Sequence, residues 1–82
     1  MVRTKFICNC VMPVAKANGE VDGYNVYLNA VYNNKNGEQS EENKEFWKYT
    51  PGGTIQFYTV NENAVKEFKQ GKYYYVDFTE SI

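Results

Sequence analysis

The chain has 82 residues, of which 43% are hydrophobic and 23% charged, so we expect one small domain over residues 1–82 rather than two. The aromatic content of 17% excludes a disordered segment, because that much large apolar surface favours a folded core. Nine basic and ten acidic residues give a net charge of −1, which argues against a protein that follows a long phosphate backbone.

The distribution of apolar residues bears on localisation. No apolar run approaches the roughly 20 residues that a membrane-spanning helix needs. No apolar stretch follows a charged start, as it would in a secretory signal. We therefore expect a soluble, intracellular protein with no membrane partner.

The first predicted strand covers Val2–Met12, where side chains alternate between two faces. The inward set is expected to be Val2, Thr4, Phe6, Cys8, Cys10 and Met12. Cys8 and Cys10 are two residues apart, so in a regular strand both thiols share a face and are expected to pack in the core. The chain has no histidine and no second cysteine pair, so we expect no metal site.

Three further strands are expected before the helix. After Pro13 and a polar turn, Tyr24–Tyr32 alternates again and should pair antiparallel with the first strand. A short strand is expected at Glu45–Tyr49, followed by a turn at Thr50–Gly53. Thr54–Val60 then predicts a strand, with Ile55, Phe57 and Thr59 on one face.

The C-terminal third predicts a helix followed by a last strand. Asn61 is a good N-cap for a helix over Glu62–Lys69, and Gly71 is expected to stop it. The last strand, Lys72–Phe78, should direct Tyr74, Val76 and Phe78 inward and Tyr73, Tyr75 and Asp77 outward.

These elements predict a mainly β fold. We expect a small antiparallel barrel or half-open barrel, similar to OB or SH3-like folds, with about five strands and one short helix before the last strand. An open α+β sheet is the alternative. An open sheet would leave a long edge at Val2–Met12 or Tyr73–Phe78, and such an edge either closes into a barrel or pairs with another copy. The small core and the aromatic side chains on both faces of the last strand favour a homo-oligomer.

No set of catalytic residues is present in the sequence. There is no histidine base, no nucleophile motif, no P-loop and no dinucleotide-binding glycine pattern. We expect a protein that is not an enzyme and needs no cofactor.

Three features could bind a ligand. Glycines and hydroxyls in the Thr50–Thr54 turn suit a backbone nest for an anion, although a plain hairpin turn has the same composition. Outward tyrosines suit base stacking, but also a dimer interface or a cross-strand ladder, and basic residues on the first strand could supply charge or merely be solvated. The candidate ligand-binding residues are Tyr73, Tyr75, Tyr58, Thr50, Gly52, Gly53, Thr54, Arg3 and Lys5.

The segment from about Asn43 to Thr79 carries recognisable motifs: ENKEF, TPGGTI, an asparagine-rich helix start and GKYYYVDF. In these motifs it resembles a family of small bacteriophage-encoded proteins of uncharacterised function. The opening RTKF and the VYLNAVY of the second strand are similar to that family as well. The resemblance implies a phage gene expressed in the cytoplasm of a bacterial host, and it implies no activity and no functional residues.

Three functional hypotheses remain open at this point. The first is a binding protein that captures a small anionic, nucleotide-like ligand, such as a signal of a host defence system. The second is an OB-like protein that binds single-stranded nucleic acid, which suits the tyrosines but not the net charge. The third is a structural module or one that blocks a host protein through its tyrosines.

Overall fold

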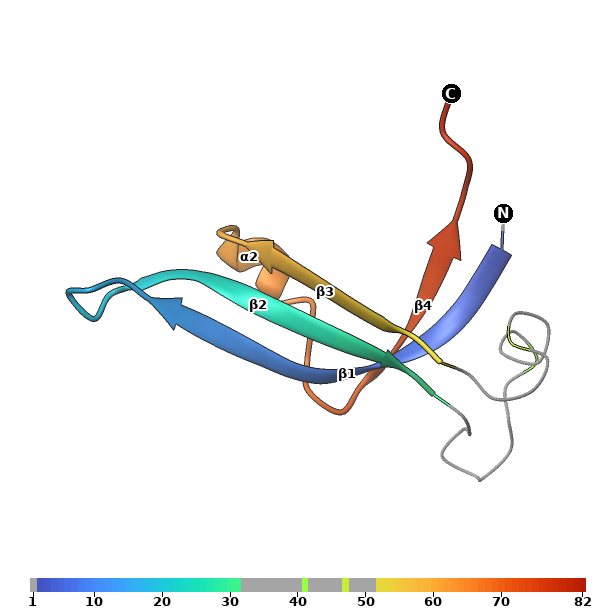
Figure 1. Ribbon diagram of the computed structural model, residues 1–82, viewed down its shortest axis with the longest axis horizontal. Helices are drawn as coiled ribbons and strands as arrows, with labels where there is room; N and C mark the ends of the chain where they lie inside the picture. The colour runs from blue at the N-terminus through green and yellow to red at the C-terminus, as the bar shows by residue number, and fades with distance from the viewer. Residues whose placement is uncertain (1, 32–40, 42–46, 48–51) are drawn as a thin grey trace.

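The computed structural model describes residues 2–31, 41, 47 and 52–82. Its described strands are β1 (Val2–Ala15), β2 (Val21–Ala30), β3 (Thr54–Thr59) and β4 (Tyr73–Phe78), with helix α2 (Glu62–Val65) between the last two. They form one antiparallel sheet in the order β3-β2-β1-β4 (Figure 1). The mainly β prediction is confirmed.

The sheet is open. β3 and β4 lie at opposite ends of the strand order, and no pairing joins them among the described residues, so a closed barrel is not confirmed. Of the expected strand Glu45–Tyr49, the structure describes Trp47, and this residue is helical. The prediction of a strand is therefore wrong at its centre. The rest of that stretch, and Tyr32 at the expected end of the second strand, lie outside the described residues.

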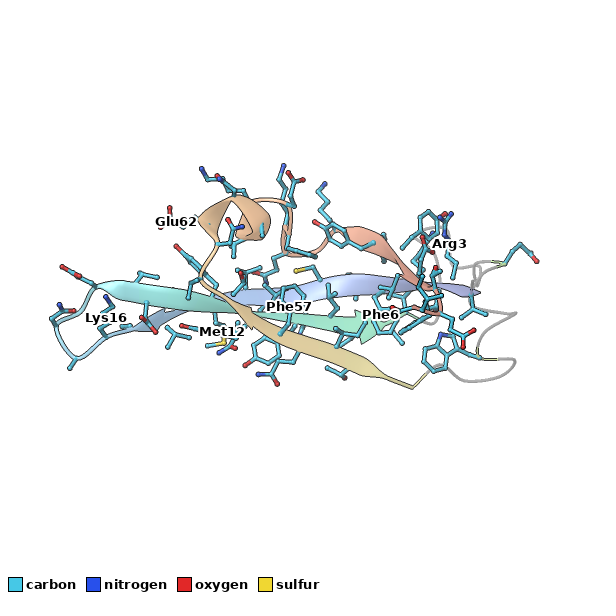
Figure 2. All side chains as sticks on the ribbon, turned by 90° about the horizontal axis from the view of Figure 1, so that it is seen from above. Arg3, Phe6, Met12, Lys16, Phe57 and Glu62 are labelled. Carbon is cyan, nitrogen blue, oxygen red and sulfur yellow. The ribbon has the colours of Figure 1, made fainter. Side chains whose placement is uncertain are left out.

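β1 pairs with two different strands along its length. Its residues Phe6–Ala15 pair with β2, whereas Val2–Ile7 pair with β4. The sheet curls as a result, and β4 and α2 lie on the same side of the β1–β2 ribbon in Figure 2. The curled part of the sheet encloses the core.

A tight turn joins β1 and β2. Within it Gly19 has φ +88° and its N–H donates to the carbonyl of Lys16 at 2.9 Å, while Asn18 Oδ1 accepts from the N–H of Glu20 at 3.0 Å. Contrary to expectation, Pro13 does not end β1. It pairs with Tyr24 of β2, and the other side of β1 has no described partner strand at this position. A proline is tolerated there, because its missing N–H is not needed at a free edge.

A β-bulge divides β1. Cys8 pairs with Leu28 and Cys10 with Tyr27, so Asn9 is an extra residue that shifts the alternation. The prediction that both thiols share a face is therefore wrong, because Cys10 lies on the outer face with Tyr27. For the same reason Met12, expected inward, is 52% exposed, while Val11 packs against the core.

The core lies on the α2 side of the sheet. Its buried hydrophobic side chains are Phe6, Cys8, Val26 and Leu28, and partly buried ones from β3, β4 and the α2 region surround them. Thr4 is also fully buried, and Trp47 Nε1 donates to its hydroxyl at 3.1 Å. Ile55 and Phe57, expected on one face of β3, both pack against this core.

The helix is shorter than expected. Asn61 caps it as expected, accepting from the N–H groups of two residues in the first turn. After Val65 the chain continues in tighter turns, and the hydroxyl of Tyr74 donates to the Glu67 carbonyl and accepts from the Lys69 N–H, each at 2.8 Å. These bonds replace further helical bonds and end the element.

β4 presents the two faces that its alternation predicts. Tyr74 and Val76 pack against the core, and Phe68 contacts Tyr74 with ring centroids 5.4 Å apart. Phe78 is an exception, because it pairs with Val2 at the end of the sheet and is 48% exposed. No helix among the described residues is long and apolar enough to cross a membrane.

Candidate functional site

The pairing of β1 with β4 assembles a group of candidate residues. Lys5 lies opposite Tyr75, Arg3 opposite Asp77, and Ile7 opposite Tyr73. Because the neighbouring positions face the core, all of these side chains lie on the outer face. The Arg3, Lys5, Tyr73, Tyr75 and Asp77 side chains are called the tyrosine–cation surface below.

The two cations of this surface lie against the tyrosine rings. The Arg3 guanidinium carbon is 4.7 Å from the ring centroid of Tyr75. The Lys5 ammonium is 5.8 Å from the Tyr73 centroid and 5.4 Å from that of Tyr75. These distances fall within the range of cation–π attraction, so the lysine ammonium can interact with both rings.

Arg3 is also held by a carboxylate. Its Nε donates to Asp77 Oδ1 at 2.6 Å and its Nη2 to Oδ2 at 3.0 Å, a bidentate arrangement that fixes the guanidinium plane. The hydrogen bonds and the positive charge of Arg3 lower the pKa of Asp77 below its ordinary value. The alternation of the last strand predicts that Asp77 points outward but indicates no role for it, since nothing local links two residues so far apart in the chain.

Tyr58 lies elsewhere on the outer face. β3 is the opposite edge of the sheet from β4, so two strands, β2 and β1, separate Tyr58 from Tyr73 and Tyr75. The expected stacking platform of three tyrosines is therefore not assembled, and Tyr73 and Tyr75 form a pair without Tyr58.

Tyr58 has a local structural role instead. Its hydroxyl donates to Asp22 Oδ2 at 2.8 Å, which raises the pKa of Tyr58. Its ring covers Gly23, where an added Cβ would collide with the Tyr58 hydroxyl. Such cover compensates for a glycine inside a strand.

The predicted Thr50–Thr54 loop is described only in part, because Thr50 lies outside the described residues. Neither Gly52 nor Gly53 has a positive φ, and the Gly53 carbonyl accepts from the N–H of Ala30 at 2.9 Å. Thr54 is exposed and pairs with Asn29, so β2 and β1 lie between it and the two tyrosines of β4. The structure does not bring the loop and the tyrosines together.

The part of the chain that the structure describes has no group of three or more His, Cys, Asp or Glu residues able to hold a metal ion. Comparison with protein-family models, with curated proteins and with solved structures found no match. The arrangement thus defines a small open β-sheet protein that exposes paired tyrosines and cations on one part of its outer face.

Proposed function

We propose that this protein is a non-enzymatic binding protein whose tyrosine–cation surface captures a small anionic, nucleotide-like ligand. The observation that carries the proposal is the position of Lys5, within cation–π distance of both Tyr73 and Tyr75. Aromatic faces suit a base, and an adjacent ammonium suits a phosphate.

The charges of the surface favour a ligand with few phosphates. Arg3, Lys5 and Asp77 together carry one net positive charge, since one carboxylate offsets one of the two cations. The whole chain has a net charge of −1, which repels a long polyanion. A ligand with one or two phosphates matches this balance better than a nucleic acid strand does.

The proposed biological setting follows from the resemblance to bacteriophage proteins. In the cytoplasm of an infected bacterium, a binding protein without catalytic groups acts by sequestration, holding its ligand away from other receptors. A nucleotide signal of a host defence system has the required chemistry, a base together with a small number of phosphates.

Nucleotide titration tests the proposal. Isothermal calorimetry with mono-, di- and cyclic nucleotides, and with single-stranded oligonucleotides, would be run at about 50 and about 200 mM salt. A nucleotide ligand should bind more tightly than about 1 mM and lose about tenfold or less in affinity at the higher salt. Lys5→Gln should weaken that binding, and Lys69→Gln, which removes an exposed lysine near α2, is the matched control.

Two outcomes would redirect the assignment. Preferential binding of oligonucleotides, with a loss of several hundredfold or more between the two salt levels, would support a single-stranded nucleic-acid binder at the same surface. If no nucleotide or oligonucleotide binds more tightly than about 1 mM, both ligand hypotheses are overturned. The third hypothesis, a module that blocks a host protein, then takes their place.

A further inference from the structure

We propose that a second copy of this chain pairs with the free edge of β3, in antiparallel register centred on Gln56. Among the described residues, β3, β4 and the half of β1 beyond Cys8 each have one edge free of a neighbouring strand over most of their length. Free edges are commonly protected from pairing by proline or charge. The free half of β1 contains Pro13 and β4 contains Asp77, but β3 contains neither a proline nor a charged residue.

The hydrogen bonds of β3 show which of its groups face outward. The Ala30 N–H donates to the Gly53 carbonyl, so Gly53 directs its backbone groups toward β2. Backbone direction alternates along a strand, so Thr54, Gln56 and Tyr58 direct their N–H and C=O groups toward the free edge. These three N–H donors and three C=O acceptors are available for hydrogen bonds to another strand, and we call them the open edge of β3.

The open edges of two copies complement each other. With Gln56 opposite Gln56 of the second copy, Thr54 lies opposite Tyr58 and every edge N–H meets a carbonyl. On the core face Ile55 then lies opposite Phe57, a β-branched and aromatic pair of the kind that stabilises sheets. The absence of charge on β3 means that this self-pairing brings no like charges together.

Burial provides a driving force for the pairing. Val26 and Leu28 on β2 are 0% and 4% exposed, whereas Phe57 and Ile55, their partners on β3, are only half-buried. Val60, directly after β3, is 67% exposed. A second copy beside β3 would cover the open side of Ile55 and Phe57 and extend the sheet across both molecules.

The test uses charge at the centre of the pairing. Sedimentation equilibrium from about 1 to about 300 µM should show a mass rising from 9.5 kDa toward twice that value. Gln56→Lys and Gln56→Glu each place like charges opposite one another and should weaken self-association about three- to fivefold. An equimolar mixture of the two variants should associate at least as tightly as the unaltered protein, because opposite charges then meet.

The matched control is Gln70→Lys, which makes the same change at an exposed turn and should leave self-association unaltered. Gln56→Pro removes an N–H that points to the free edge and should abolish association while β3 keeps its bonds to β2. A monomer at about 300 µM would overturn the proposal. Association unaffected by the Gln56 charge variants, or not restored in their mixture, would overturn the register centred on Gln56.

Discussion

Cys8 and Cys10 lie on opposite faces of β1, although one residue separates them. Asn9 is the extra residue of the bulge, so Cys8 remains on the core face with Leu28 while Cys10 joins Tyr27 on the outer face. Cys8 is fully buried, and its burial raises the pKa of its thiol, with a further contribution from nearby Cys10. The two thiols should therefore differ in reactivity.

Alkylation of the native protein with iodoacetamide should modify Cys10 at least about tenfold faster than Cys8, because a buried thiol reacts only after local opening. Peptide mass spectrometry of timed samples measures both rates. Cys10→Ser should leave one slowly reacting thiol, and denaturant should make both react at similar rates. Equal rates in the native protein would contradict the placement of the bulge.

Phe57 contributes to the core from β3 without being fully buried. Its ring meets that of Phe68 edge to face, with centroids 5.2 Å apart. Phe57→Ala should lower the free energy of unfolding by about 2–3 kcal/mol, less than is typical of a fully buried phenylalanine. Urea denaturation measures the change. Phe78→Ala, at a 48% exposed phenylalanine, is the control and should cost about 1 kcal/mol or less. Equal costs at the two positions would contradict the placement of the core.

The hydrogen bond from Trp47 to Thr4 ties the segment before β3 to the buried face of β1. Thr4→Val keeps the shape but removes the hydroxyl that accepts from the indole, and should lower the free energy of unfolding by about 1–2 kcal/mol. Trp47 is the single tryptophan, so its fluorescence reports both unfolding and the loss of the bond. Thr54→Val, at an exposed threonine, should change stability by less than about 0.5 kcal/mol. A Thr4→Val variant as stable as the parent would show that this bond contributes nothing.

Local patterns in the sequence predicted those features that depend on neighbouring residues. The alternation of Thr54–Val60 placed Ile55 and Phe57 on one face, which packs against the core, and Asn61 identified the start of α2. The alternation of β4 likewise placed Tyr73 and Tyr75 outward. Each of these follows from a period of two or from a capping residue, and needs no knowledge of the partner strand.

Features that depend on pairing between distant segments were not predictable in this way. The extra residue Asn9 is recognisable only against β2, because an isolated strand has no register to interrupt. Strand order separates Tyr58 from Tyr75, and no local signal encodes strand order. The pairing of Arg3 with Asp77 joins residues 74 positions apart and depends on the same topology.

The Arg3–Asp77 pair predicts a pH dependence of stability. The pKa of Asp77 is lowered in the folded state, so the pair contributes stability above the ordinary aspartate pKa of 3.8 and loses it as the pH falls through the lower folded-state value. The difference in melting temperature between the parent and Asp77→Asn should be constant near neutral pH and should disappear in acid. It should also be small, because the two side chains are 44% and 37% exposed.

Calorimetric melting of both proteins across the pH range measures this difference. Glu80→Gln removes the same charge from the exposed C-terminal tail, so it separates the Arg3 contact from an effect of net charge. Added salt should reduce the Asp77 difference at neutral pH, because salt screens exposed charges. A difference that persists unchanged in acid would show that the carboxylate charge is not its cause.

The proposed ligand site makes its own prediction about the tyrosines. Tyr73→Ala or Tyr75→Ala should weaken binding of a nucleotide ligand by about 1–3 kcal/mol, the contribution of one stacked base. Tyr75 is 53% exposed and Tyr73 lies on the same outer face, so the fold should be retained, as circular dichroism can verify. Tyr58→Ala removes a similarly exposed tyrosine from the opposite edge of the sheet and should leave affinity unchanged. If Tyr58→Ala weakens binding as much as Tyr75→Ala does, the ligand does not bind at the tyrosine–cation surface alone, and the proposed site is wrong.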